Sequence, residues 1–437
     1  MEIIGINKDN IKKISKIKNE SDKIRDFRLE SFNNFEKIDM PNFGPNIKLD
    51  FDKIIYYKND KKDEEIKNDW NNILKPIVDE LDSVGVMEAE SHMGGMGVQY
   101  ESEVIYHSML EEIEKKNVIF TSIENAMRLY PDIVDKYFGK IVSNNENKFA
   151  ALNGAVFSGG SFIYIPPNTK LDRPLQSYFR INAKNMGQFE RSLIIVDDNS
   201  ELHYIEGCTA PSYSESSLHA AVVEIYVGKN SKCRYSTIQN WANNVYNLVT
   251  KRALVEENGT MEWIDGNIGS CVTMKYPCCV LKGNYAKGTC ITISMASSGQ
   301  IQDSGARMIH LGKHTKSTIL SKSISKNGGA ANYRGKVYID SKADNSEALV
   351  KCDTLILDDK SKSDTFPDNS CYNTSSSIEH EATVSKISED NLFYLMSRGI
   401  SKDRAEELIV LGFIEKFREE LPMEYAVELN QLIKRNI

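Results

Sequence analysis

The chain has 437 residues, of which 41% are hydrophobic and 27% are charged, which is typical of a soluble globular protein with two or three domains. The formal net charge of -8 argues against a broad electrostatic surface for nucleic acid or anionic lipid. Every apolar run is far shorter than the roughly 20 residues of a membrane span, and the N-terminus has no secretory signal pattern. We therefore expect a cytoplasmic protein that crosses no membrane.

The cysteine pattern indicates free thiols. Eight cysteines are scattered along the chain and none forms a C-x-x-C motif, so neither a zinc knuckle nor a ferredoxin-type cluster motif is encoded locally. In a reducing compartment we expect thiols and no disulfide framework. Any metal ligands must therefore come together from distant segments.

Residues 1–148 carry mainly helical patterns. Apolar residues recur at spacings of three and four over Asp63–Leu81 and at near-helical spacing over Glu101–Lys116, and Pro131 opens a further short helix. The glycine-rich string SHMGGMGVQY between the first two runs predicts a flexible connection. We expect an N-terminal helical region.

Residues 149–385 consist of short alternating strands separated by turns at a regular interval. The turns fall at Asn199-Ser200, Asn230-Ser231, Asn258-Gly259, Ala286-Lys287, His314-Thr315 and Ala343-Asp344. A period of about 28 residues without helical patterning predicts a β-solenoid, which we expect to be a right-handed parallel β-helix. The alternative is a large β-sandwich, although sandwich turns usually come every ~8–12 residues.

Residues 386–437 return to helical patterning. Ser388 is a suitable N-cap, Gly399 ends the first helix and Ser401 begins another. Such short helices either cap the open end of the solenoid, which is the default interpretation, or offer an apolar face to a partner.

The repeat predicts which reactive residues meet, because residues one coil apart lie about 4.8 Å apart in a parallel solenoid. Arg180, Cys208 and Gln239 follow one another at intervals close to this period, which predicts a single column of these side chains. Asn182 and Trp241, two positions further along their strands, would share its side of the sheet. An arginine beside a buried thiol would favour the thiolate. The alternative is that Cys208 is a small buried apolar residue and Arg180 faces solvent.

A second candidate group lies near the C-terminal end of the solenoid. Cys352 and Glu381 are again one period apart, and Glu379 and Glu381 flank His380. A thiol, an imidazole and a carboxylate together suit iron. The alternative is that Glu379–Glu381 is a solvated charged turn.

The two groups cannot share a bond or a metal ion. The stretch of chain between Cys208 and Cys352 corresponds to about five coils, and hence to about 24 Å along the axis. If both thiols are functional, a chemical group must travel between them. Polar residues on the intervening coils, including Lys251 across the coil from Gln239, are the candidate path.

Eight strings of the chain match a known family in the same order. They are YIEGCTAP (204–211), STIQNWANN (236–244), VTKRAL (249–254), MKYPCCVLKG (274–283), ARMIHLGKHTKSTILSKSIS (306–325), YRGKV (333–337), KCDTLIL (351–357) and IEHEATVSKISEDNLFYLMSRGIS (378–401). These strings resemble SufB, the scaffold subunit of the SUF iron–sulfur cluster assembly machine, in the SufB/SufD family. The resemblance runs from about Met93 to the C-terminus, and we place no resemblance in the segment before it.

The resemblance implies a helical N-terminal region, a β-helix core and a C-terminal helical domain that docks an ABC-type ATPase, SufC, over about residues 389–420. It implies that Cys208 accepts persulfide sulfur from a cysteine desulfurase and its carrier. It also implies a passage for sulfur through the β-helix. The polar residues that match this passage are Arg180, Asn182, Gln239, Trp241 and Lys251.

The resemblance further implies that a transient iron–sulfur cluster, of the 4Fe–4S type, forms at Cys352 and Glu381 with His380 beside them. The cluster would lie at an interface with a SufD-like paralogue or a second copy of the chain and would pass to apo iron–sulfur proteins. Reduced flavin stays open as a second cofactor. The chain itself would be a scaffold and not an enzyme.

Two rival functions fit parts of the sequence. A β-helix enzyme that cleaves acidic polysaccharides would be secreted and would carry an acidic calcium cluster on an exposed groove. A SufD-like structural stabiliser would have no cluster ligands of its own, and the presence of both Cys208 and Cys352 argues against it.

Overall fold

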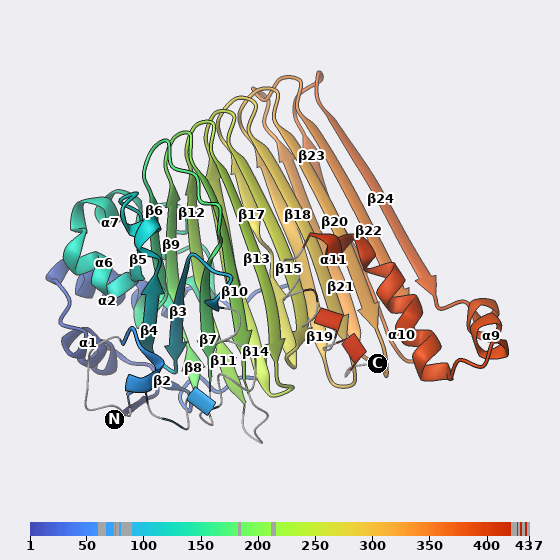
Figure 1. The fold of residues 1–437 in the computed structure, drawn as a ribbon, viewed down its shortest axis with the longest axis horizontal. Helices are drawn as coiled ribbons and strands as arrows, with labels where there is room; N and C mark the ends of the chain where they lie inside the picture. Colours follow the sequence, from blue (N-terminus) through green and yellow to red (C-terminus); the bar gives the residue numbers. More distant parts are fainter. Residues whose placement is uncertain are drawn as a thin grey trace.

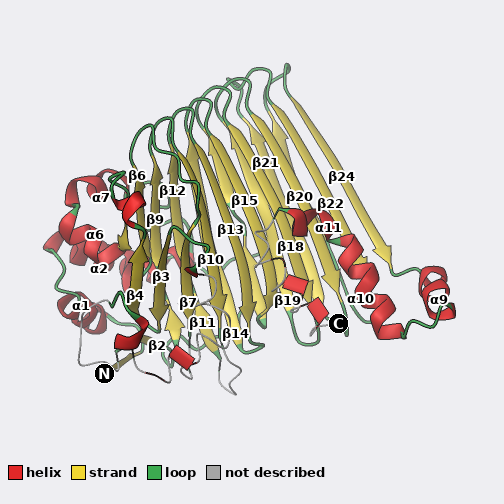
Figure 2. Ribbon diagram, viewed as in Figure 1, coloured by secondary structure: helices red, strands yellow, loops and turns green. Residues whose placement is uncertain are grey.

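The computed structural model describes residues 1–59, 67–73, 90–181, 185–210 and 216–420, together with residues 75, 78, 79, 426, 429, 430, 433 and 434. This part of the chain is mainly β. Two long sheets form a β-solenoid of about 7 turns that is flanked by N-terminal and C-terminal helices (Figures 1 and 2). The predicted fold class is therefore confirmed.

The first wall of the solenoid is a 10-stranded sheet, whose strands from β7 onward pair in parallel. From β7 onward, successive strands of this wall are one coil apart in sequence, so the chain advances by one strand with each coil. The strands are β3 (Gly95–Tyr100), β4 (Glu103–Met109), β7 (Leu175–Arg180), β10 (Glu201–Thr209), β13 (Lys232–Trp241), β15 (Thr260–Gly269), β18 (Lys287–Ala296), β20 (Lys316–Ser325), β22 (Glu347–Ile356) and β24 (Ser377–Lys386).

The second wall is a 12-stranded sheet that faces the first across the interior. Its strands are β5 (Ile119–Ser122), β6 (Ser161–Ile165), β8 (Gly187–Gln188), β9 (Arg191–Val196), β11 (Ser217–His219), β12 (Val222–Val227), β14 (Val245–Val255), β16 (Val272–Lys275), β17 (Cys278–Leu281), β19 (Ile301–His310), β21 (Ala330–Ile339) and β23 (Thr365–Cys371). Figure 1 shows the coils stacked side by side from the N-terminal to the C-terminal end.

The turns that close the coils share one backbone conformation. Residues with a left-handed φ between 52° and 61° recur at Asn168, Asn199, Asn230, Asn258, Tyr285, His314 and Asn345. Asparagine tolerates this conformation better than most residues, and the Asn230 side chain also donates to the Asn199 amide oxygen at 3.1 Å. The predicted turn repeat is confirmed, although the interval between these positions varies from coil to coil.

The N-terminal region combines helices and strands, which the sequence patterns predicted only in part. Its helices include α1 (Lys8–Ile17), α2 (Asp22–Lys37), α6 (Ile123–Leu129), α7 (Pro131–Tyr137) and α8 (Lys148–Val156). They gather at the N-terminal end of the solenoid (Figure 2), and α7 begins at Pro131 as predicted. A short strand pair, β1 (Glu2–Ile4) with β2 (Ile55–Lys58), lies beside them.

Two predictions for this region are wrong, and a third falls partly outside the described residues. The helix predicted over Glu101–Lys116 is strand β4 followed by the single turn α5 (Glu111–Glu114). The string predicted as a flexible connection contains β3, because its glycines permit close approach to neighbouring side chains and to the β4 backbone. About half of the helix predicted over Asp63–Leu81 lies outside the described residues. Within the described stretch 67–73, residues 70–72 form a 3-10 turn instead of an α-helix.

The C-terminal helices α9 (Glu389–Ser397), α10 (Lys402–Phe413) and α11 (Glu415–Glu419) do not cap the solenoid. Val410, Ile414 and Phe417 are buried in one cluster with outward-facing isoleucines of the first wall, and the Lys322 ammonium lies 4.5 Å from the Phe413 ring centroid. Figure 1 shows α10 and α11 lying across this wall and α9 projecting beyond β24. The default capping interpretation is therefore wrong.

None of the helices in the described ranges combines the length and the hydropathy that a membrane crossing requires.

Candidate functional site

Two neighbouring columns of inward-facing residues on the first wall are polar over six consecutive strands. In-register pairing defines the columns from β10 to β22. The first column is Cys208, Gln239, Asn267, Ser294, Ser323 and Thr354, and the second is Glu206, Thr237, Asp265, Thr292, Ser321 and Cys352. All twelve residues are buried, so we call this double column the polar seam.

The second wall supplies a matching polar column opposite the seam. Parallel pairing aligns Gln188, His219, Asn247, Thr273 and Gln302, and all five are buried. The Asn247 amide nitrogen donates to the Gln239 amide oxygen at 2.7 Å, and the Ser294 and Ser304 hydroxyls lie 2.5 Å apart. Solenoid interiors are ordinarily filled by apolar side chains, as the remainder of this interior is. The interior is therefore divided into an apolar part and a polar part.

The two thiols lie at opposite ends of the seam. Beyond Cys208 the next residue of its column is Phe179, and beyond Cys352 the next residue is Ala382. Five inter-strand steps separate β10 from β22, which corresponds to about 24 Å at about 4.8 Å per step. The predicted separation of the thiols is thus reproduced, with a continuous buried polar path between them.

Two buried ion pairs connect the walls across the seam. Lys251 Nζ lies 3.2 Å from Glu206 Oε1, and Lys275 Nζ lies 2.9 Å from Asp265 Oδ1. Burial opposes charge on Lys251, but Glu206, Asp265 and Cys208 together outweigh it and raise the pKa of Lys251 above its ordinary value. Burial lowers the pKa of Lys275, which Asp265 opposes. Each ammonium therefore has a carboxylate partner, as buried charges require.

The seam keeps hydrogen-bonding capacity that its own residues do not use. Among the described residues, no partner exists for Thr237 Oγ1, Gln239 Nε2, Asn267 Oδ1 or Ser321 Oγ. Buried polar atoms are rarely left unpaired, because each costs about 1–3 kcal/mol. A run of such atoms along one path can form hydrogen bonds with a small polar ligand.

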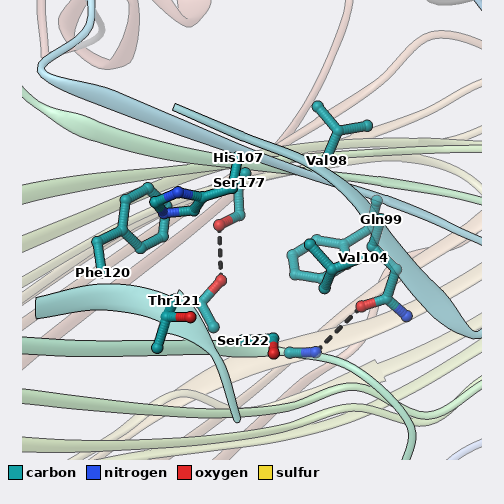
Figure 3. Close-up of a pocket in the computed structure, with 12 residues that line it drawn as sticks. Val98, Gln99, Val104, His107, Phe120, Thr121, Ser122 and Ser177 are labelled. Carbon is teal, nitrogen blue, oxygen red and sulfur yellow. Dashed lines mark hydrogen bonds between the residues drawn. The ribbon is translucent and has the colours of Figure 1, made fainter. Parts of the chain in front are cut away.

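The N-terminal end of the seam is closed. Ser177, which continues the second column past Glu206, lines the small cavity of Figure 3 together with His107, Phe120 and Gln99. The cavity measures about 10 Å³, which is space for about one water molecule. The column that contains Cys208 continues on this side with the apolar Phe179, whereas on the other side it stays polar as far as Thr354.

The surroundings of Cys208 match the predicted column in part. Gln239 pairs in register with Cys208, and Trp241 packs in the same buried cluster as the thiol. Arg180 instead pairs with Thr209 and donates to its hydroxyl at 2.7 Å, so it lies on the opposite face of the strands and the prediction of a shared column is wrong. Asn182 lies outside the described residues.

The thiolate form predicted for Cys208 is not favoured. Burial raises the pKa of the Cys208 thiol well above its ordinary value, and the carboxylates of Glu206 and Glu190 add to this effect. At neutral pH the residue is a neutral thiol. It becomes a thiolate only when a proton acceptor, a metal ion or a reaction partner removes its proton.

A buried group of potential ligands surrounds this thiol. Glu190, Cys208 and His219 each offer one ligand atom, and these atoms lie within 4.8 Å of one another. His219 Nε2 forms a short hydrogen bond with Glu190, and Nδ1 lies 2.7 Å from the Asn247 amide oxygen. Neither Glu190 nor His219 was singled out by spacing, because they belong to the second wall.

A signal for the seam nevertheless exists in the sequence. The strings Glu206-Gly207-Cys208, Thr237-Ile238-Gln239 and Asp265-Gly266-Asn267 place polar residues at alternate positions of three consecutive coils. In strands, alternate positions share one face. This alternation would have identified Glu206 and Asp265 had the strands been aligned by their turns.

At the other end of the seam, Cys352 lies near His380 and not near Glu381. Cys352 Sγ is 4.0 Å from His380 Nε2, whereas Glu381 pairs in register with Lys351 and forms an exposed ion pair with it at 3.1 Å. The predicted contact between Cys352 and Glu381 is therefore wrong. The in-register partner of Cys352 is Ala382, one position after Glu381, so this coil is one residue longer than the interval between Cys352 and Glu381.

The chemistry of this end suits a metal ligand pair. Burial raises the pKa of Cys352 to about 12, and the Tyr333 hydroxyl opposes this shift. Burial lowers the pKa of His380, so its imidazole is neutral and available as a ligand at neutral pH. A neutral imidazole and a thiol that loses its proton on metal binding can hold iron.

Two protein families match the chain, one for each of its parts. The family described as "SUF system FeS cluster assembly, SufBD core domain" matches residues 179–413, and the family described as "SufBD protein N-terminal region" matches residues 8–177. The second match covers the segment before Met93, in which the sequence strings alone place no resemblance.

Similar proteins come from staphylococci. An iron–sulfur cluster assembly SufBD family protein of Staphylococcus aureus strain MRSA252 is 56% identical over 432 residues, which are 98% of this chain and 92% of the relative. A protein of the same description from Staphylococcus epidermidis is 56% identical over 432 residues, with the same shares of the two chains.

Proposed function

The chain belongs to the SufBD family of iron–sulfur cluster assembly proteins, and from this premise we propose that it is a non-enzymatic scaffold on which a cluster is built. Sulfur is accepted at Cys208, moves along the polar seam and is used at Cys352. The observation that carries the proposal is the seam itself, with a thiol at each end of adjoining buried polar columns.

Sulfur acceptance at Cys208 is a transfer between persulfide and thiol. The Cys208 sulfur attacks the outer sulfur of a donor persulfide, the donor's S–S bond breaks and a new S–S bond forms at Cys208. The donor leaves as a thiol and takes up the proton that Cys208 loses, so the step involves no net oxidation or reduction. A cysteine desulfurase with its carrier is the proposed donor.

The passage uses residues on both walls of the solenoid. Gln239, Trp241 and Lys251 are buried along or beside the seam. A two-electron reductant of the thiol class would return the Cys208 persulfide to a thiol and release its outer sulfur as hydrosulfide, while the reductant is oxidised to a disulfide. Thr237 Oγ1 and Asn267 Oδ1, which have no partner among the described residues, offer hydrogen bonds to this hydrosulfide. Arg180 acts from the outer face through Thr209. Asn182 is retained in the proposal on the family resemblance alone.

The cluster, proposed to be of the 4Fe–4S type, is the cargo of the C-terminal end. Cys352 and His380 are its proposed ligands, since their side chains lie 4.0 Å apart. Glu381 is exposed at the same edge and is available to a cluster held between this chain and a partner. Recipients would be apo iron–sulfur proteins.

Two surfaces support the proposed partners. β24 and β23 end the two walls, so a SufD-like paralogue or a second copy of the chain would pair there. On α9, Phe393 is 74% exposed and Tyr394 is 57% exposed, which favours docking of a SufC-type ATPase on these helices. The proposal places the assembly in the cytoplasm and includes no reduced flavin, for which the comparisons give no support.

We expect Cys352→Ser to lose most of the cluster that the parent chain forms in anaerobic reconstitution with iron, sulfide and reductant, because the substitution removes a ligand. Cluster absorbance and iron content are the measurements. Cys371→Ser is the matched control, since this exposed thiol belongs to neither column of the seam. Equal cluster formation by Cys352→Ser and the parent would refute the ligand assignment.

The sulfur step is tested without added iron. A desulfurase and cysteine should place a persulfide on the Cys208 peptide of the parent chain, and Cys208→Ser should abolish it while Cys352→Ser does not. Mass spectrometry of the alkylated peptides is the measurement. A persulfide confined to other cysteines would favour the SufD-like stabiliser as the function of this chain.

A further inference from the structure

The buried group formed by Glu190, Cys208 and His219 has the composition of a metal site as well as of a sulfur acceptor. Glu190 immediately precedes β9, Cys208 lies on β10 and His219 ends β11, so the group bridges the two walls. Their ligand atoms lie within 4.8 Å of one another, and all three residues are fully buried. A small movement of these side chains brings them around one ion.

We propose that Glu190, Cys208 and His219 bind one divalent transition-metal ion in the interior of the solenoid. A thiolate, an imidazole and a carboxylate suit Zn²⁺ or Fe²⁺. The identification of the ion as Fe²⁺ rests on the proposed function. The proposal that these three residues bind a divalent ion does not depend on that function. Three protein ligands leave a fourth position open, as in metal sites that react.

An independent observation at Glu190 points to a ligand. Its second carboxylate oxygen, Oε2, is buried and has no hydrogen-bond partner among the described residues. A buried carboxylate oxygen without a partner is costly, and coordination to a cation would satisfy it.

The surroundings of His219 hold it as a ligand. Nδ1 faces the Asn247 amide oxygen at 2.7 Å, and Asn247 is in turn fixed by its 2.7 Å hydrogen bond to Gln239. An acceptor at Nδ1 keeps the proton there and leaves Nε2 to bind the ion, which is the usual arrangement around metal-binding histidines. The Trp241 ring, 4.7 Å from the imidazole, covers the group on one side.

Charge balance in the interior permits a cation here. The two nearest ammonium groups, Lys251 and Lys275, are each paired with a carboxylate. When the ion binds, the Cys208 thiol releases its proton, and the resulting thiolate offsets part of the charge of a dication.

Anaerobic titration of the full chain with Co²⁺, which reports thiolate ligation through a charge-transfer band, tests the site. We expect one equivalent to bind with this band, and Cys208→Ala to abolish it. Glu190→Gln and His219→Gln should weaken binding at least about 10-fold, and Asn247→Leu should weaken it about 10- to 100-fold. Cys233→Ala, which removes an equally buried thiol outside the group, should change nothing.

Alkylation provides a second readout. Bound Co²⁺ should protect the Cys208 peptide from a thiol reagent and leave the exposed Cys371 unprotected. Absence of the band in the parent, or its persistence in Cys208→Ala, would overturn the proposal. If a variant loses its native circular dichroism, the alkylation assay on the parent and on Glu190→Gln tests the site instead. Co²⁺ should protect the Cys208 peptide in the parent and protect it less in Glu190→Gln. Failure of the metal site leaves the iron-free persulfide assay unaffected, so the two proposals are distinguishable.

Discussion

Lys251 is the residue at which burial and charge compete most directly. It is 1% exposed, pairs with Glu206 across the interior and lies 4.3 Å from the Tyr235 ring centroid. Burial would raise the pKa of Glu206, but Lys251 and the Tyr235 hydroxyl outweigh it, and the pKa of Glu206 lies below its ordinary value. Removing the lysine reverses this balance and leaves a buried carboxylate alone.

We therefore expect Lys251→Met to destabilise the protein at neutral pH by about 3–5 kcal/mol, the usual cost of breaking a buried ion pair. The difference should shrink as the pH falls toward about 4.3, the ordinary pKa of glutamate. In the variant, burial raises the pKa of Glu206, so protonation relieves the unpaired carboxylate. In the parent this pKa is depressed, so the contribution of the pair is lost only as the pH falls below the ordinary value. Urea unfolding midpoints at pH 7 and pH 4 measure the effect.

The matched control is the double variant Lys251→Met with Glu206→Gln, which removes both charges and should recover much of the loss. A pH-independent difference between Lys251→Met and the parent would contradict the assigned balance.

The sequence predicts which side chains are neighbours in a column only where the coil between them has the assumed length. The one-coil spacing correctly placed Gln239 beside Cys208. It misplaced Arg180 and Glu381 by one position each, because coil length varies and a shift of one position moves a side chain to the other face of its strand. Partners on the second wall, such as His219, depend on how the walls face each other, which spacing does not give.

At the level of elements, the C-terminal helices α10 and α11 pack against the outer face of the first wall. Phe417, which is 1% exposed, shares a buried cluster with Ile264 and Ile293 of the first wall. An ion pair at 3.0 Å between Arg234 and Glu420 connects the same helical segment to β13. The helices are thus held by side chains from several coils, while α9 has little such contact.

Phe417→Ala should release α10 and α11 from the wall at a local cost of about 3–5 kcal/mol, the range for removing a buried phenylalanine side chain. Hydrogen exchange of these helices should accelerate while exchange of the solenoid strands stays slow. Phe393→Ala is the control, because that ring is already exposed. Unchanged exchange in Phe417→Ala would show that the ion pairs suffice to hold the helices.

The repeat itself was readable from the sequence, because turn asparagines recur and alternating strands accompany them. The strands that precede the solenoid were not, since β3 is glycine-rich and β4 carries apolar residues at spacings that also fit a helix. Pairing with the wall, as of β3 with β7, overrides such local patterns.

At the scale of the whole molecule, the solenoid is closed at one end and open at the other. The N-terminal helices cover the first coils (Figure 1), whereas β24 is exposed along most of its length. An unpaired sheet edge is a template for another chain, and here it lies beside Cys352 and His380.

We expect Val384→Lys, which places a charge on an edge side chain that is 56% exposed, to reduce pairing with a SufD-like paralogue or a second copy of the chain. Light scattering after size-exclusion chromatography measures the assembly. Leu129→Lys, a similarly exposed position on the helices of the other end, is the control. An unaltered assembly mass for Val384→Lys would place the interface elsewhere.

The repeated left-handed turn has a consequence for how such a molecule can vary. Because each coil closes in the same way, insertion or deletion of one complete coil between Cys208 and Cys352 would alter the distance between the two thiols by about 4.8 Å and leave every remaining side chain on its own face. A single inserted residue inside a strand would instead turn the following polar positions outward. The length of the solenoid can therefore change only by whole coils. Related proteins can differ in the number of coils while each inward-facing polar residue keeps its orientation.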